Sequence, residues 1–154
     1  MNKTLAAETK KTAKAIASSM TNYEVDFFPI EMEGKFIEKI KMLDRYEKGN
    51  FGEFDAEMNT LDAKDYDLVI FGMPTYGPET PKTFLEVLKR MKNLNGKKAI
   101  VFATARFSGG KTVEYMKTKV EETGAQVINK AKFRRMFYLG VKKSTTFGKE
   151  INEG

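Results

Sequence analysis

The amino-acid sequence predicts one α/β domain over residues 1–154, built as a doubly wound, mainly parallel sheet. Residues 68–71 and 99–103 are apolar without interruption, which is typical of parallel strands covered on both faces. A segment with helical periodicity follows each of these runs, at the spacing expected of βα units. The chain is also long enough to form an ordinary hydrophobic core as a single domain.

The N-terminal part is expected to contain a helix, a strand and a second helix. Residues 9–20 carry apolar side chains at the i, i+3, i+4, i+7 spacing of one helical stripe. Residues 23–30 alternate and are rich in aromatic and β-branched side chains, which predicts a strand. Residues 31–62 are interpreted as a short helix over 36–43 followed by an irregular excursion, because glycines interrupt the later pattern.

After this excursion the predicted elements alternate regularly. Strands are expected at residues 67–74, 97–104 and 125–139, and helices at 83–94, 111–124 and 142–152. Gly96 and Gly124 stand where glycine commonly ends a helix. The strand at 125–139 is expected to be bulged.

Several classes of function are excluded by composition. The chain has no cysteine and no histidine, which rules out disulfides, cysteine nucleophiles, Ser-His triads and the usual zinc sites. No metal site is therefore expected. No apolar run approaches the roughly 20 residues of a membrane span, and no hydrophobic block of a signal peptide opens the chain. We expect a cytoplasmic protein that does not bind a membrane.

The net charge of +6 is unevenly distributed. Residues 23–67 contain six basic and thirteen acidic side chains, whereas residues 68–154 contain seventeen basic and seven acidic side chains. The C-terminal part therefore has a positive bias that suits an anionic cofactor, an acidic partner or nucleic acid. Solvated lysines on helix surfaces would give the same count.

Two loops follow strands at the edge of the sheet where α/β proteins bind ligands. They are "GMPTYGPETP", residues 72–81, and "TARFSGG", residues 104–110. Tyr76 and Phe107 each offer a flat ring for stacking, and the glycines around them allow close approach to the backbone. These residues predict a site for a flat heteroaromatic ligand, although ordinary βα loops with an exposed tyrosine remain an alternative.

The segments "DYDLVIFGMPTYG", "KAIVFATARFSGG" and "GAQVI" resemble the second half of a flavodoxin-type flavoprotein, and the resemblance runs from Thr9 to Phe147. It implies a flavodoxin-like, doubly wound parallel sheet whose first strand is missing or irregular. It also implies FMN as the cofactor, with the isoalloxazine ring held between the two loops. The residues implied as FMN-binding are Thr4, Thr9, Pro74, Thr75, Tyr76, Gly77, Thr104, Ala105, Arg106, Phe107, Ser108, Gly109 and Gly110.

The N-terminus departs from this family. The family has an apolar first strand and a hydroxyl-rich phosphate loop, of which Thr4 and Thr9 match the outer two hydroxyl positions. Three explanations are open: a truncated or misstarted chain, a makeshift strand around Leu5 with a shortened loop, or a re-paired sheet that involves another protomer. Glu8 adds a carboxylate near the expected phosphate, which neighbouring lysines could offset.

The leading functional hypothesis is an FMN-binding, flavodoxin-like redox protein, acting in electron transfer or as a reductase. The alternative is a flavodoxin-fold interaction or regulatory protein that has lost flavin binding. Nucleic-acid binding is disfavoured, because strand alternation separates Phe133 and Phe137 from Lys132 and Arg134. The expected partner is a redox protein, with an acidic one favoured by the positive charge of the chain, and the chain is expected to be a monomer or homodimer.

No catalytic residue is identified from the sequence. Tyr76, Arg106 and Tyr115 are able to assist proton transfer or to bind a substrate anion, but each residue type is more often found in packing or surface roles.

Overall fold

The computed structural model describes residues 2–28, 35–74, 82–105, 111–134 and 139–153. Its elements in chain order are α1 (Asn2–Ser19), α2 (Phe36–Glu47), the 3₁₀ turn η1 (Gly52–Phe54), α3 (Asp55–Asn59), β1 (Leu68–Pro74), α4 (Lys82–Arg90), β2 (Lys98–Ala105), α5 (Thr112–Glu121), β3 (Gln126–Arg134) and α6 (Leu139–Glu153). The described strands form one parallel sheet in the order β1-β2-β3. The expected α/β class and flavodoxin-like parallel arrangement are confirmed.

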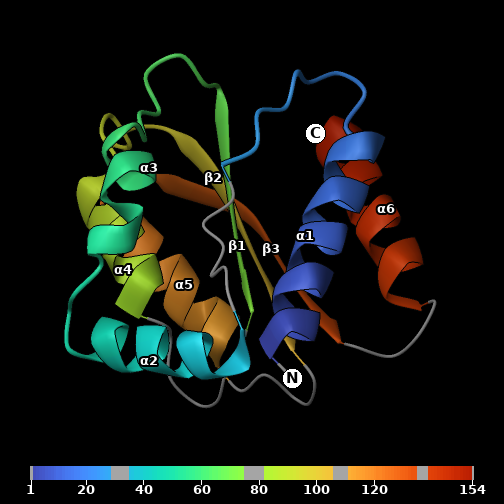
Figure 1. Ribbon diagram of the computed structural model, residues 1–154. Coiled ribbons are helices and arrows are strands. Elements are labelled where there is room, and N and C mark those ends of the chain that lie inside the picture. The colour runs from blue at the N-terminus through green and yellow to red at the C-terminus, as the bar shows by residue number, and fades with distance from the viewer. Residues whose placement is uncertain (1, 29–34, 75–81, 106–110, 135–138, 154) are drawn as a thin grey trace.

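Helices cover both faces of this sheet (Figure 1). On one face, α4 and α5 pack a core that includes Phe71, Leu88 and Met116. On the other face, α1 and α6 pack a core that includes Ile16 and Phe102. Because β2 lies in the middle and is buried from its second residue to its last, it contributes to both cores. This is the doubly wound architecture that the uninterrupted apolar runs predicted.

The α1–α6 contact is close because both helices use small side chains where they meet. A Cβ atom on Gly148 would lie 2.0 Å from the Ser19 hydroxyl and 2.4 Å from the Ile16 carbonyl oxygen. Ser144, also on α6, is fully buried. The helical stripe predicted over residues 9–20 is confirmed, since Ile16 and Met20 are buried in this layer.

The N-terminal part differs from the sequence prediction in two ways. Helix α1 already begins at Asn2, so the makeshift strand around Leu5 is wrong. This segment contains good helix formers and no glycine or proline that would end a helix. The strand expected over residues 23–30 is also wrong for residues 23–28, which are irregular, and the remaining two positions lie outside the described residues.

Residues 36–59 are more helical than expected. The short helix predicted over 36–43 is confirmed and extended to Glu47, and the following excursion contains η1 and α3. Its aromatic side chains form a small separate cluster in which Tyr46 stacks on Phe51 at 5.6 Å between ring centroids. This cluster packs beside α4 through Val87.

The C-terminal elements match the prediction, with shifts at their ends. Helix α4 ends at Arg90 instead of residue 94, because Lys92 forms an isolated bridge to Asp62 and Asn93 has a positive φ of 60°. The bulge expected in β3 is confirmed, since Ala99 pairs with Val127 whereas the next residue of β2 pairs with Asn129. Strand β3 ends at Arg134, and residues 135–138 lie outside the described part. None of the described helices is both long and apolar enough to cross a bilayer.

Candidate functional site at the carboxyl ends of the strands

The two loops identified from the sequence leave adjacent strands at the same end of the sheet. Pro74, the last residue of β1, lies opposite Thr104 in the parallel register, and Ala105 ends β2 one residue later. Neighbouring strands in a sheet are about 4.8 Å apart. The structure therefore brings the starts of the two loops side by side, as expected for two walls of one site.

The remaining predicted loop residues lie outside the described part of the chain. These are Thr75, Tyr76 and Gly77 in the first loop, and Arg106, Phe107, Ser108, Gly109 and Gly110 in the second. Their roles stay predictions. The described residues fix only where each loop begins and where the next helix starts.

The sequence predicts that Gly72 lets a ligand approach the backbone. In the structure, this glycine also makes room for an aromatic ring of the core. A Cβ atom at this position would lie 2.1 Å from Cζ of Phe102, whose ring lies across β1. Phe102 in turn makes an edge contact with Phe133 on β3, at 5.9 Å between centroids. Glycine is therefore required here because an aromatic ring of the core occupies the space of a side chain.

The N-terminus of α1 lies at the same end of the sheet (Figure 1). The first four backbone N–H groups of a helix lack helical partners, and the helix dipole adds a partial positive charge there. The first turn of α1 contains no acidic residue. This helix end can therefore receive an anionic group next to the strand ends.

The family resemblance implies that Thr4 and Thr9 are the outer two hydroxyl residues of a phosphate loop. In the structure, both lie within α1. Positions five residues apart in a helix are separated by about 140° around the axis and about 7.5 Å along it. The two positions therefore do not face one anion together as they would in a wrapped loop. What the structure offers at this point is a helix N-terminus, which is a simpler anion site.

Thr112 is a residue that sequence reasoning missed. It is the first residue of α5, directly after the second loop, and only 2% of its surface is exposed. Its hydroxyl oxygen is buried and has no hydrogen-bond partner within the described structure. An unused polar group at this end fits a site that binds a polar ligand. The signal in the sequence was a hydroxyl residue at a helix start after "SGGK".

Ionisable groups do not identify a catalytic residue. Tyr115, one of the sequence candidates, is 39% exposed, and the Lys119 ammonium lies 5.6 Å from its ring centroid, which is a surface cation–π contact. Lys130 hydrogen-bonds to Glu114 and lowers the pKa of that carboxyl. A hydrogen bond to Asp26 raises the pKa of Tyr66, which stands before β1 at the other end of the sheet. No cluster of potential metal ligands occurs among the described residues.

Comparison with known proteins gives a family and a fold. The family model described as "NADPH-dependent FMN reductase" matches residues 2–135. A comparison with curated protein sequences gave no match.

Among the solved structures that share the fold are two flavodoxins and a flavoprotein. A flavodoxin from the domain Archaea is 17% identical, with a TM-score of 0.58 over 96% of this chain and 90% of that one. The two-electron reduced flavodoxin of Megasphaera elsdenii is 18% identical, with a TM-score of 0.55 over 95% and 91%. A flavoprotein of Lactobacillus acidophilus, solved in complex with FMN, is 22% identical, with a TM-score of 0.54 over 80% and 84%.

Proposed function

We propose, from the premise that this chain belongs to the NADPH-dependent FMN reductase family, that its FMN site lies where β1, β2 and the N-terminus of α1 meet. The chain is an FMN-binding, flavodoxin-like redox protein that works with a redox partner. In our proposal the ring lies between the loops after Pro74 and Ala105. The phosphate lies at the first turn of α1.

One observation carries this assignment. Pro74 and Thr104 are neighbours in the register, so the two loops start side by side at the end of the sheet where α1 begins. In open α/β sheets, ligands bind outside the carboxyl ends of the strands. The residues proposed to contact the ring are Thr75, Tyr76, Gly77 and the segment 106–110.

The residues present fit FMN, although not in the way that the flavodoxin resemblance implied. The free N–H groups at the start of α1 suit the phosphate, and the unpartnered Thr112 hydroxyl supplies a further polar group beside the second loop. FMN, when bound, supplies the hydride and electron chemistry, whereas the protein binds and orients it. Because a helix end replaces the hydroxyl-rich loop, we expect the phosphate to contribute modestly to affinity, by about 1 kcal/mol.

The test is a titration of flavin-stripped protein with FMN and, in parallel, riboflavin, followed by quenching of flavin fluorescence. We expect saturable quenching by both, with FMN binding about fivefold tighter because of the helix N-terminus. Tyr76→Ala should weaken both ligands equally. Thr4→Glu, which puts a carboxylate into the first turn of α1, should weaken FMN and leave riboflavin unchanged. Absence of quenching by both flavins would refute the proposal and favour an interaction protein without flavin.

We further propose that NADPH is the electron donor, which would make the chain a reductase. Anaerobic addition of NADPH to the FMN-loaded protein should bleach the flavin absorbance, with release of NADP⁺. If dithionite bleaches the flavin and NADPH does not, the chain is instead an electron carrier that another protein reduces. A cytoplasmic location, an acidic partner and a monomeric or homodimeric state belong to the same proposal.

A further inference from the structure

A groove lies between β3 and α6, next to the proposed flavin end of the sheet. Its volume is about 420 Å³, and it is lined by Phe133, Lys142, Lys143, Thr146, Phe147 and Glu150. Phe133 pairs with Thr104 in the β2–β3 register. The backbone of Phe133, in the groove, therefore lies one inter-strand spacing, about 4.8 Å, from the backbone of Thr104, at the proposed ring site.

The floor of the groove is aromatic. Phe133 and Phe147 are each more than 90% buried, and their rings make an edge contact at 5.8 Å between centroids. Phe133 is also held by Phe102 in the core, so the floor continues into the packed layer beneath α1 and α6. A rigid apolar floor of this kind suits the insertion of an apolar side chain.

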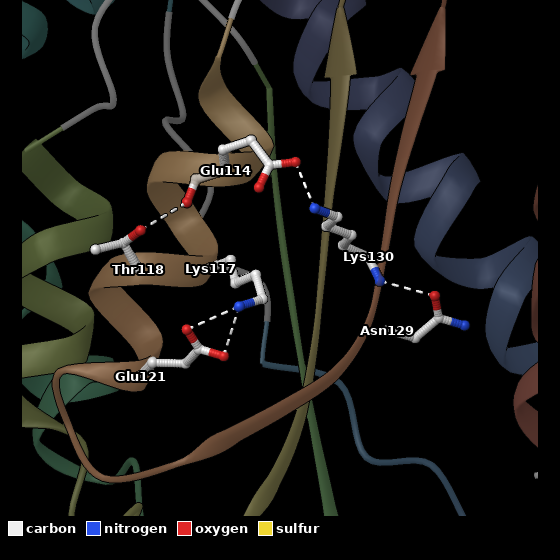
Figure 2. Close-up of polar contacts among 6 residues, drawn as sticks. All are labelled: Glu114, Lys117, Thr118, Glu121, Asn129 and Lys130. Atoms are coloured by element: carbon white, nitrogen blue, oxygen red, sulfur yellow. Dashed lines mark hydrogen bonds and ion pairs between the residues drawn. The ribbon is translucent and has the colours of Figure 1, made fainter.

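The rim of the groove carries unpaired positive charge. Lys142 and Lys143 are exposed, and neither forms an ion pair within the described structure. Glu150 lies further along the groove. Some other lysines have acidic partners, as Figure 2 shows for Lys130 with Glu114 and Lys117 with Glu121. The rim lysines are therefore available to an external anion, whereas those in Figure 2 are neutralised locally.

The charges of α6 also oppose its helix dipole. Lys142 and Lys143 stand near the N-terminus of α6, where a helix favours anions, and Glu150 and Glu153 stand near the C-terminus, where it favours cations. The first turn has no acidic residue and the last has no basic one. This arrangement costs the helix some stability, so helix stabilisation does not explain the lysines.

We propose that this groove is the docking site of an acidic partner protein, which places an apolar side chain on the floor formed by Phe133 and Phe147 and pairs its carboxylates with Lys142 and Lys143. This inference rests on the proposed function, because it places the redox partner beside the flavin end of the sheet. Charge complementarity selects the partner, since the whole segment 68–154 has ten more basic than acidic residues.

The test measures binding of a small acidic [2Fe–2S] ferredoxin, used as the probe, by NMR titration and by calorimetry. We expect shifts confined to β3 and α6, and an affinity that falls as salt rises. The variant Lys142→Glu/Lys143→Glu should raise the dissociation constant at low salt at least about tenfold. Its thermal stability should be equal or higher, because glutamates suit the N-terminus of α6.

Two further variants separate the groove from general charge. Lys89→Glu/Lys92→Glu makes the same change of charge on exposed lysines of α4 and the residues after it, and should alter binding less than about threefold. Thr146→Trp fills the groove without changing its charge and should weaken binding by about tenfold. Equal losses from both lysine pairs, or an unaffected Thr146→Trp, would overturn the proposal. So would tight binding of a single-stranded oligonucleotide at the same lysines without ferredoxin binding.

The same samples separate this inference from the proposed function. If FMN binds and the groove variants leave ferredoxin affinity unchanged, the docking site is wrong and the flavin assignment stands. If ferredoxin docks in the groove while the protein fails to bind FMN, the docking site stands and the flavin assignment is wrong.

Discussion

Residues 2–67 and residues 68–153 differ in how much of the sheet and of the hydrophobic cores they form. The C-terminal part forms the described sheet and three helices on its two faces, with cores centred on β2. The N-terminal part adds α1 to one of these cores and Ala63 to the other, and it forms a small aromatic cluster around Tyr46. It also exposes large side chains, including Phe27 at 48% and Phe28 at 53%.

The difference teaches that a segment with strand-like composition stays irregular where the described residues offer it no strand partner. In the flavodoxin-like order 2-1-3-4-5, the first strand lies between the second and third. The described strands correspond to the last three, and among the described residues no strand lies where the segment 23–28 would pair. Within the described part of the chain, Phe27 and Phe28 of this segment are exposed and β1 has no strand on its outer edge.

The largest expected effect is the loss of stability when an aromatic side chain is truncated in the C-terminal part, compared with the same truncation in the N-terminal part. Phe102→Ala removes a ring that is 2% exposed and joins β1, β2 and β3, so it should cost about 3 to 5 kcal/mol of unfolding free energy. Phe28→Ala should cost less than about 1 kcal/mol, because its ring is half exposed and touches Tyr66 at its edge. Urea denaturation measures both. A comparable loss from the two variants would mean that the N-terminal segment is buried in solution.

Glycine substitutions sharpen the same contrast. Gly72→Ala forces a methyl group into the ring of Phe102 and should cost about 1 to 3 kcal/mol. Gly52→Ala, in the N-terminal part, meets its nearest atom at 3.5 Å and should change stability by less than about 0.5 kcal/mol. In a double-mutant cycle, Phe102→Leu should relieve part of the cost at position 72. Additive effects would show that the two residues do not compete for space.

The sequence predicted the C-terminal part well because its signals are local. Each apolar run and the helix after it form a βα unit whose partner strand is the next unit along the chain, so pattern and packing agree. The strand prediction for residues 23–30 failed for the described positions because β-propensity needs a partner strand. Helix α1 extended to Asn2 because nothing in the sequence stops it.

For the site, the sequence placed the strand ends correctly and did not reveal the packing role of one residue. Pro74 and Thr104 are adjacent as expected from parallel strands. The role of Gly72 depends on the rotamer of a side chain from another strand, which no local pattern reveals. The buried state of the Thr112 hydroxyl likewise depends on how α5 packs.

Substitutions of Thr112, in the C-terminal part, are expected to change the stability by an intermediate amount. Thr112→Val replaces an unpartnered buried hydroxyl by a methyl group of similar shape and should raise the stability of the flavin-free protein by about 1 kcal/mol. Thr112→Ser keeps the hydroxyl and loses the methyl group, so it should lower stability by a similar amount. Thermal unfolding distinguishes them. A loss of stability in Thr112→Val would show that the hydroxyl is hydrogen-bonded in solution.

The ion pair between Glu114 and Lys130 gives a small acid-dependent effect between α5 and β3 (Figure 2). The Glu114 pKa is lowered on folding, chiefly by the hydrogen bond from Lys130. The stabilisation is therefore present above the unfolded pKa near 4.5 and is lost as the pH falls through the lower folded value. Carboxyl NMR titration of wild type and Lys130→Ala measures this. An unchanged Glu114 pKa in the variant would contradict the contact.

The smallest expected effect concerns the contact that holds segment 23–28 to the start of β1. The Tyr66 hydroxyl donates to Asp26 at 2.8 Å, and this bond raises the Tyr66 pKa above 10.0. Its stabilisation is complete below the unfolded pKa and is lost as the pH rises through the raised folded value, which is the opposite direction to Glu114. Ultraviolet difference titration against Tyr66→Phe isolates this phenol, with Tyr23→Phe as the control in the exposed segment. If Asp26→Asn leaves the Tyr66 titration unchanged, the hydrogen bond does not hold segment 23–28 against the start of β1.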